Sequence, residues 1–399
     1  MACPEVTIQT ILGTECIGDS LPKINTNFST LGDAACDLIT DVGALSAYTV
    51  SKFPVTNANI AFDGGSFAFR NKIINGNFDI WQRGISLASG TWERFLADRF
   101  LNTSVGSTYT VSQQPFTLGQ NNVPNEPTYF HRTVVTSSAG NGNYASFAQR
   151  IESVKTLANK NVTLSFYAKA DSNKQMSVDF AQEFGTGGSP SSQVNGIGVQ
   201  KINLTTSWQK FTVTVGIPSI SGKTLGTNNN NCLAVNFWFD AGSDLNSRTD
   251  SLGQQSGTFD IAQVQLEEGS VATPFEQRPI GTELALCQRY YEKSYIQNVK
   301  PGTPGAGSAT HSYPINSGIS WDVTFRCYYK VKKRTIPVVT GYSPYTGTTD
   351  KFQWGNDPTV SDVALSNGFV PDENLFHTGG ITVISYRNCY LDWTADAEL

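Results

Sequence analysis

A strict alternation of apolar and polar side chains limits the fold of this chain more than any other feature of its sequence. Between residues 162 and 169 every second side chain is apolar, namely Val162, Leu164, Phe166 and Ala168. Residues 144–151, 207–215 and 233–239 have a similar pattern, and segments rich in Gly, Asn and Ser separate them. Successive side chains of a strand point to opposite faces, so each segment predicts a half-buried antiparallel strand. Together they predict a two-sheet sandwich.

The composition agrees with an all-β protein. Of 399 residues only 15% are charged, 11% are aromatic, and 36 are Gly. A chain of this length can form two or three domains, each with its own core. The formal net charge is −5, and the main basic run, Lys330-Val331-Lys332-Lys333-Arg334, alternates like a solvated strand edge. We therefore expect no nucleic-acid partner.

The first residues have neither a basic start nor an apolar run, so they do not predict a signal peptide. No apolar run approaches the length of a membrane span. We expect synthesis in the cytoplasm of the host cell and no membrane insertion. The seven cysteines are odd in number and lack CxxC spacing, which disfavours a disulfide framework or a metal knuckle.

Two distant stretches bracket the alternating segments. Residues 72–84 contain a short apolar run followed by a polar turn and Trp81, and residues 257–269 contain a longer apolar pattern. We expect the two stretches to lie side by side as the first and last strands of one domain.

Several strings within this region resemble carbohydrate-binding-module-like jelly rolls. They are Asn75-Gly76-Asn77-Phe78-Asp79, Phe259-Asp260-Ile261, Val264-Gln265-Leu266-Glu267, Thr163-Leu164-Ser165-Phe166 and Ser207-Trp208-Gln209-Lys210. The string Ala272-Thr273-Pro274-Phe275-Glu276 resembles the version of this module in bacteriophage tail and fibre proteins. The string Leu286-Cys287-Gln288-Arg289-Tyr290-Tyr291 resembles the segment that follows the jelly roll in many phage tail proteins. The resemblance covers residues 70–278 and implies a jelly-roll β-sandwich.

The chain divides into four predicted parts. Residues 1–65 form an N-terminal segment and connector, 66–279 the jelly roll, 280–309 a helix and linker, and 310–399 a smaller C-terminal β domain. In the first part the apolar residues at helical spacing are Leu21, Ile24, Phe28 and Leu31. This segment resembles N-terminal segments of phage virion proteins, which implies docking on other virion proteins. An ordinary small helical subdomain is the alternative.

The region after residue 279 predicts one helix and several strands. Residues 282–294 predict a short amphipathic helix, and residues 319–327 alternate without interruption. Further strands are expected at 336–340, 381–386 and 389–395. The fold class is therefore mainly β, with a jelly roll, a short helical N-terminal anchor and a C-terminal β domain.

The sequence contains little that predicts catalysis. None of the three histidines lies in a recognisable motif, and Gly185-Thr186-Gly187-Gly188 lacks the lysine of a phosphate loop. Glu267 and Glu268 are adjacent, so they would face opposite sides of a strand and could not flank one glycosidic bond. Other carboxylate pairs that meet only in the fold stay open. We expect that this protein is not an enzyme.

The resemblance also implies a structural Ca²⁺ that ties the first strand to the last. The matching positions are Asn75, Asp79 and Asp260, and hard oxygen ligands suit this ion. Alternatively, the two aspartates cap turns or pair with Arg83 and Arg278.

Sugar binding requires exposed aromatic rings beside polar side chains. The candidates are Trp238, Tyr167 and Tyr129 in the jelly roll, and Trp354 and Tyr345 in the C-terminal domain. Trp81, Trp208 and Trp321 occupy positions that predict packing in a core instead.

These observations and the resemblance favour a non-catalytic virion protein of the bacteriophage tail-fibre or receptor-binding type. It would bind host surface polysaccharide, and the family resemblance implies a homotrimer. The first alternative is an architectural virion component without a ligand, such as a head decoration, collar or baseplate spacer. The second is a capsule depolymerase.

Overall fold

The computed structural model describes residues 69–90, 94–297, 299–306, 311–313, 321–323, 325–355, 361–365, 368–378, 381–383 and 389–399. Residues 66–399 form one compact unit. The predicted docking residues Leu21, Ile24, Phe28 and Leu31 lie outside the described residues. In the described part no helix is long and apolar enough to cross a membrane.

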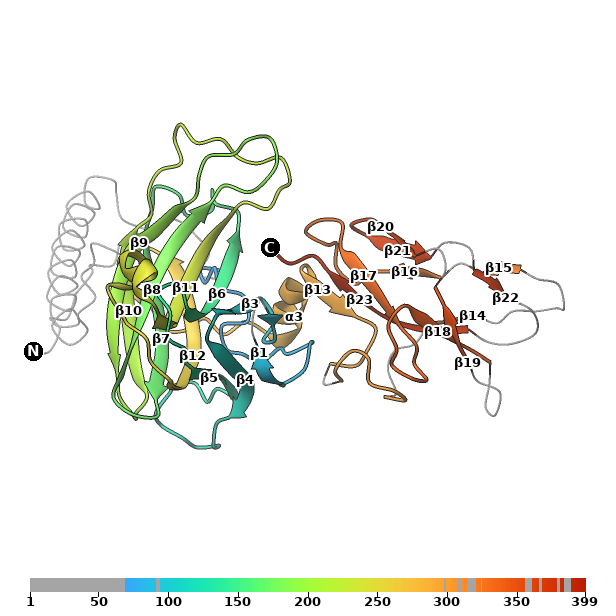
Figure 1. Ribbon diagram of the computed structural model, residues 1–399, viewed down its shortest axis with the longest axis horizontal. Helices are drawn as coiled ribbons and strands as arrows, with labels where there is room; N and C mark the ends of the chain where they lie inside the picture. Colours follow the sequence, from blue (N-terminus) through green and yellow to red (C-terminus); the bar gives the residue numbers. More distant parts are fainter. Residues whose placement is uncertain are drawn as a thin grey trace, which may run out of the picture. The chain divides into compact units, whose positions relative to one another are not determined.

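Two antiparallel sheets of six strands each form a β-sandwich (Figure 1). The first sheet has, in spatial order, β1 Ser86–Gly90, β4 Thr108–Pro115, β5 Tyr129–Thr136, β12 Gly257–Glu268, β7 Asn161–Ala170 and β10 Gln209–Gly216. The second has β2 Arg94–Phe95, β3 Phe100–Val105, β6 Tyr144–Glu152, β11 Cys232–Ala241, β8 Lys174–Glu183 and β9 Val194–Leu204. A short 3₁₀ helix, Ser243–Leu245, and α2 Asn246–Thr249 follow β11. The predicted mainly β, jelly-roll class is confirmed.

The alternation in sequence produces the core between the sheets. Val162, Leu164, Phe166 and Ala168 of β7 are all fully buried in it. Aromatic rings fill its centre. The ring centres of Phe166 and Phe237 lie 5.1 Å apart in an edge-to-face contact. A fully buried side chain of this size contributes roughly 1.5–3 kcal/mol through the hydrophobic effect. The inward-facing side chains, which recur at every second position of each strand, therefore form the core that holds the two sheets together.

The first bracketing stretch lies beside β12, as predicted, but it is not a strand. Lys72 N donates to Leu266 O at 2.7 Å and Val264 N donates to Gly76 O at 2.9 Å. The backbone of Asn75 and of Phe78 has positive φ, 60° and 57°, which is incompatible with an extended strand. Residues 72–78 therefore form an irregular turn, which isolated hydrogen bonds join to β12 in place of a regular strand ladder.

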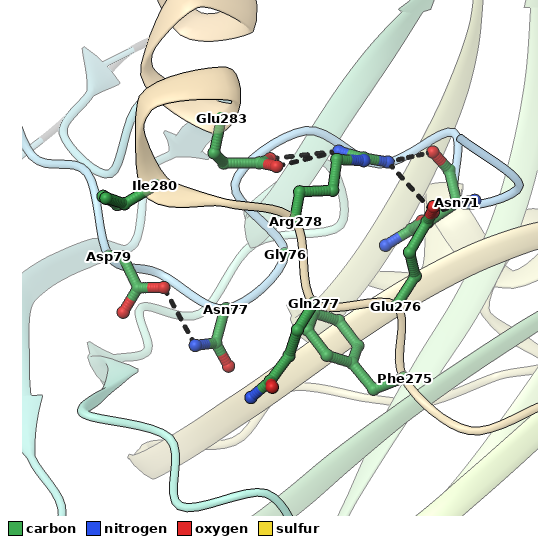
Figure 2. Close-up of a pocket in the computed structure, with 10 residues that line it drawn as sticks. All are labelled: Asn71, Gly76, Asn77, Asp79, Phe275, Glu276, Gln277, Arg278, Ile280 and Glu283. Atoms are coloured by element: carbon green, nitrogen blue, oxygen red, sulfur yellow. Dashed lines mark hydrogen bonds and ion pairs between the residues drawn. The ribbon is translucent and has the colours of Figure 1, made fainter. Parts of the chain in front are cut away.

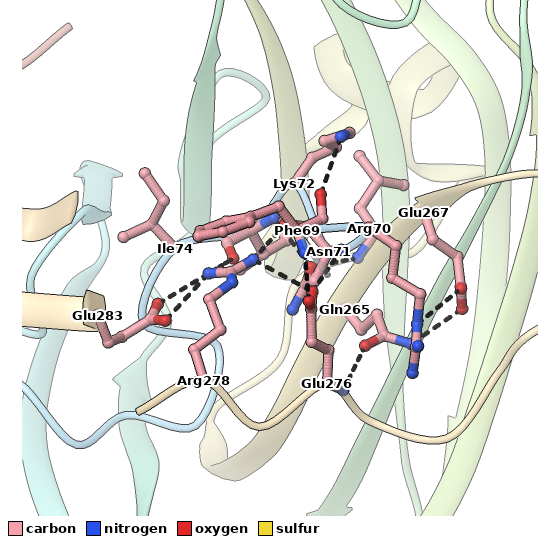
Figure 3. Close-up of polar contacts among 12 residues, drawn as sticks. Phe69, Arg70, Asn71, Lys72, Ile74, Gln265, Glu267, Glu276, Arg278 and Glu283 are labelled. Atoms are coloured by element: carbon pink, nitrogen blue, oxygen red, sulfur yellow. Dashed lines mark hydrogen bonds and ion pairs between the residues drawn. The ribbon is translucent and has the colours of Figure 1, made fainter. Parts of the chain in front are cut away.

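Side chains complete this closure (Figure 3). Asn71 Oδ1 accepts from Leu266 N at 3.0 Å, and Asn71 Nδ2 donates to Val264 O at 3.3 Å. The Arg278 guanidinium donates to Ile73 O and to both carboxylate oxygens of Glu283. Arg278 thus fastens the segment after β12 to the start of the sandwich.

The C-terminal region has one helix and eleven short strands among its described residues. They are α3 Ile280–Gln288, β13 Tyr291–Lys293, β14 His311–Tyr313, β15 Trp321–Val323, β16 Arg326–Tyr328, β17 Val338–Tyr342, β18 Lys351–Trp354, β19 Ser361–Ala364, β20 Phe369–Pro371, β21 Leu375–Thr378, β22 Ile381–Val383 and β23 Cys389–Asp396. The strand β23 pairs with β13, β14, β17 and β18. A second core includes Phe325, Phe352, Phe376, Leu391 and Trp393.

Two predictions for this region need correction. The predicted helix 282–294 ends at Gln288, and Tyr291–Lys293 forms β13 instead. The alternating residues 319–327 are divided between β15, which pairs with β22, and β16, which pairs with β21.

The basic run at 330–334 is also not a fully solvated edge. Lys333 is fully buried and its Nζ donates to Glu292 Oε2 at 2.5 Å. Burial lowers the pKa of Lys333, against the raising effect of the Glu292 carboxylate. Lys333 is therefore part of the folded interior, where Glu292 is the ion-pair partner that a buried ammonium needs.

Replacing Gly76 by Ala should break the closure on β12. A Cβ at residue 76 would lie 2.1 Å from Val264 O, a backbone atom that cannot move away cheaply. We expect a loss of about 3 kcal/mol in unfolding free energy, as for other overpacked sites. Gly281→Ala in α3 is the matched control, because nothing lies within 4 Å of its Cβ position. Urea denaturation of both variants measures the effect, and equal stability would contradict this account.

The pH dependence of stability should depend on His131. This buried imidazole packs against Phe78, Trp81 and Phe147, and burial lowers its pKa to about 3. Below the ordinary value of about 6.5 the unfolded chain gains a proton that the folded chain does not, so stability falls by up to about 1.4 kcal/mol per pH unit. His131→Phe should flatten the unfolding free energy between pH 6.5 and about 3. An unchanged pH profile would show that another group causes the acid loss.

Candidate functional site

The outer face of the first sheet carries the side chains best suited to bind a ligand. On β7 the residues between the core-facing positions, Ser165, Tyr167 and Lys169, point away from the core. Lys210 of β10 lies directly opposite Tyr167, and Ala262 of β12 lies opposite it on the other side. Cross-strand partners share one face of a sheet, so these residues form one continuous row.

Aromatic rings cluster beside this row. Trp208, in the turn between β9 and β10, has its ring centre 5.2 Å from that of Phe130 and 5.3 Å from that of Phe116. Tyr167 and Trp208 pack against Val123, Phe130 and Ala262 and remain half-buried. We call Phe116, Phe130, Tyr167 and Trp208 the aromatic platform. Burial raises the pKa of Tyr167, so its hydroxyl is neutral at physiological pH.

A pocket of about 130 Å³ adjoins the platform. Its lining residues come from β7, β10, β12 and two loops: Pro124, Asn125, Ser165, Tyr167, Lys210, Gln263, Pro274 and Phe275. Gln263 lies in a β-bulge of β12, with φ of 48° and a register shift between Ala262 and Gln265. Its Nε2 donates to Pro124 O at 2.7 Å, whereas its buried Oε1 has no hydrogen-bond partner among the described residues.

A charged group borders the platform on the next row. Arg132 holds both oxygens of Asp260, at 2.7 and 2.8 Å, and Lys169 Nζ lies 3.6 Å from Asp260 Oδ2. The hydrogen bond to Asp260 raises the pKa of Arg132. Lys169 also lies over the Trp208 ring, 5.4 Å from its centre. Arg132 lies over the Phe130 ring and Lys169 over the Trp208 ring, so two rings of the aromatic platform make cation–π contacts.

The predicted sugar-binding residues are not gathered at one place. Tyr167 lies in the pocket beside the platform. Tyr129 is half-buried at the start of β5, Trp354 is half-buried beside the second core, and Tyr345 is 56% exposed. The structure thus offers Tyr167 within a site and Tyr345 as an isolated exposed ring.

Trp238 requires a correction. It is only 4% exposed, and its Nε1 donates to the buried Asp179 at 2.8 Å. Tyr144 covers it in an edge contact and Arg248 lies 4.8 Å from its ring centre. Its ring faces are therefore not available to stack on a sugar.

The residues predicted to hold Ca²⁺ have separate structural tasks. Asn75 Oδ1 accepts from Ile80 N at 3.0 Å, and its Nδ2 donates to the carbonyls of Ile80 and Asp98. Both oxygens of Asp260 are taken by Arg132. Among the described residues no group of three or more His, Cys, Asp or Glu side chains is placed to hold a metal ion. The predicted set does not fit the six to eight oxygens that Ca²⁺ prefers.

Asp79 instead lines a second pocket, of about 170 Å³, next to the closure (Figure 2). Asn77 Nδ2 donates to Asp79 Oδ2 at 2.9 Å, and Arg278 and Glu283 line the pocket too. Burial raises the pKa of Asp79 and Glu283 raises it further, against the Asn77 hydrogen bond, which lowers it. The ionised form of the Asp79 carboxylate therefore destabilises the folded state.

Sequence reasoning missed three site residues. Trp208 was assigned to a core, but it shares the alternation phase of Lys210, opposite to that of the buried Val213 and Val215, so it lies on the outer face. Lys210 follows the ordinary pattern of a solvated strand position, and Gln263 belongs to a bulge. The run Ile261-Ala262-Gln263-Val264 contains the phase shift that marks this bulge, because Ile261 and Val264 are both in the core.

Comparison with known proteins finds no matching family model and no matching curated protein. Among solved structures, a carbohydrate-binding module, CBM4, is similar at 17% identity over 49% of this chain and 97% of its own, with a TM-score of 0.28. The enzymatically active domain of tailspike protein 4 of bacteriophage CBA120 is similar at 14% identity over 50% of this chain and 21% of its own, with a TM-score of 0.28. A family 11 module from Clostridium thermocellum, in complex with a β-1,3-1,4-mixed-linked tetrasaccharide, is similar at 13% identity over 46% of this chain and 99% of its own, with a TM-score of 0.27.

Replacing Asp79 by Asn should raise stability at pH 7, because it removes a desolvated charge that faces Glu283. The gain should shrink as the pH falls toward the ordinary aspartate pKa, since protonation then relieves the wild type as well. Asp244→Asn, at an exposed position, is the control. Melting temperatures with Ca²⁺ and with a chelator complete the test. A wild-type melting temperature that drops on chelation, with no such drop in the Asp79 variant, would reveal a cation at this carboxylate.

Proposed function

We propose that this chain is a non-catalytic glycan-binding protein of a virus particle, of the bacteriophage tail-fibre or receptor-binding type. The observation that carries glycan binding is the aromatic platform next to the unpartnered, buried Oε1 of Gln263. The platform supplies apolar ring surface, and the pocket supplies directed polar groups. This combination distinguishes the outer face of the first sheet from an ordinary solvated sheet surface.

The chemistry of a sugar matches both elements. The apolar face of a pyranose ring stacks on an aromatic side chain, and Tyr167 is the platform ring that lines the pocket. A sugar hydroxyl can donate to Gln263 Oε1, which otherwise leaves a buried acceptor unsatisfied at a penalty of about 1–3 kcal/mol. A ligand with many hydroxyl groups thus gives Gln263 Oε1 the hydrogen-bond partner that it lacks in the free protein.

The place in a virus particle rests on the resemblance of Ala272-Thr273-Pro274-Phe275-Glu276 and of the α3 segment to phage tail proteins. In this proposal the N-terminal segment docks on other virion proteins, the chain forms a homotrimer, and the β-sandwich meets the host polysaccharide. Weak contacts repeated over several copies add up to firm adhesion.

Tyr167→Ala should lower the affinity of the full-length protein for its glycan by about tenfold, since stacking of one ring contributes on the order of 1 kcal/mol or more. Trp208→Phe should weaken binding less, because a ring remains. Tyr328→Ala is the matched control, as Tyr328 is 66% exposed on β16, away from the platform. A glycan array followed by calorimetry measures these affinities.

Other outcomes would favour the alternatives. Stoichiometric presence in virions without binding to any host glycan would indicate an architectural component. Release of oligosaccharides from host capsule would indicate a depolymerase. Loss of binding in Tyr345→Ala but not in Tyr167→Ala would move the site to the C-terminal region.

A further inference from the structure

We propose that the ligand of the aromatic platform is an anionic polysaccharide, whose carboxylate groups bind Lys210 and Lys169. This inference rests on the proposed glycan-binding function and names the class of glycan. It follows from the placement of charge on the outer face of the first sheet.

Lys210 has the position required to meet a ligand. It lies directly across from Tyr167 in the pairing of β10 with β7, and it lines the same pocket as Tyr167 and Gln263. It is exposed and makes no ion pair with any described residue. A ring stacked on Tyr167 would therefore lie beside a free ammonium group.

Lys169 provides a second cation, over the Trp208 ring of the platform. Asp260 lies opposite both Lys169 and Arg132, but Arg132 alone satisfies both of its oxygens with two short hydrogen bonds. The longer contact of Lys169, at 3.6 Å, leaves most of its donors for a ligand. The three cations against one carboxylate give this face a net positive charge.

The carboxylates next along the chain do not cancel this charge. Glu267 pairs with Arg70 and accepts from Thr273 N and Oγ1. Glu126, in the loop before β5, accepts from Gly119 N and keeps its charge, so the three cations still exceed the carboxylates Asp260 and Glu126 by one. The whole chain carries a net charge of −5, so a polyanion would be repelled by the molecule on average. A local positive face on an acidic protein therefore selects the point at which a polyanion makes contact.

A sugar acid satisfies all of these groups together. Its ring stacks on Tyr167, its carboxylate accepts from Lys210, and one of its hydroxyls donates to Gln263 Oε1. A neutral hexose would leave Lys210 unused. A sulfated sugar offers the same charge with a different shape, so sulfate and carboxylate are separated by experiment.

The test compares polygalacturonate with its methyl ester, which keeps the sugar backbone and removes the charge. The full-length protein should bind polygalacturonate more tightly than the ester, and this preference should shrink as salt is added. Lys210→Gln should reduce the affinity for polygalacturonate about tenfold and the affinity for the ester much less, because the ester carries no carboxylate charge. Lys155→Gln, the same charge change at an exposed position in the loop between β6 and β7, should change neither.

The outcomes separate this inference from the proposed function. Equal binding of both polymers, or binding of neutral glycans only, with Tyr167→Ala still harmful, would overturn the anionic class and leave glycan binding intact. Tighter binding of dextran sulfate than of any uronic acid polymer would overturn the carboxylate assignment. Failure to bind any acidic or neutral polysaccharide would overturn both.

Discussion

The hydrogen bonds between the Asn71 side chain and β12 are the interaction that holds the first segment of the sandwich beside its last strand. They join residues that are 195 and 193 positions apart in the chain, so they close the whole domain at once. The side chain substitutes for a regular ladder, because the positive φ of Asn75 prevents the first segment from forming a strand. Arg278, in the segment that follows β12, then secures the same first segment by bonding Ile73 O and Glu283. The position of β12, and with it the outer face, is thereby set.

This closure has a direct effect on the candidate site. β12 lies between β5 and β7 in the first sheet, so it carries Asp260 toward Arg132 on one side and Lys169 on the other. The loop that follows it brings Pro274 and Phe275 to the pocket of Gln263. One strand therefore serves both the core and the binding face, with Phe259 and Leu266 buried inward. In the proposed function, stability and ligand recognition would thus depend on the same strand.

The sequence allowed the sandwich to be predicted because a period of two leaves few alternatives once one face is apolar. It also predicted that residues 72–84 lie beside residues 257–269, although it mistook the first stretch for a strand. The site was harder to predict, since it is assembled from side chains on β7, β10, β12 and two loops. Tyr167 was found by its alternation, whereas Trp208 was assigned to a core although its phase matches that of Lys210, and Gln263 depends on a bulge whose geometry overrides the local phase. Trp238 was misplaced because a buried acceptor, Asp179, holds its indole nitrogen.

The bulge at Gln263 also constrains how such a binding face can diversify. Its extra residue returns Val264 and Leu266 to the core after Ile261. Deleting this residue would move the side chains of the second half of β12, from Val264 onward, to the opposite face of the sheet. Length changes are therefore excluded at Gln263, whose Oε1 has no hydrogen-bond partner among the described residues. New ligand preferences at this spot can arise in relatives only by exchanging one side chain for another, at constant spacing. The adjacent loops, which have no such phase to preserve, are left as the places where insertions can be accepted.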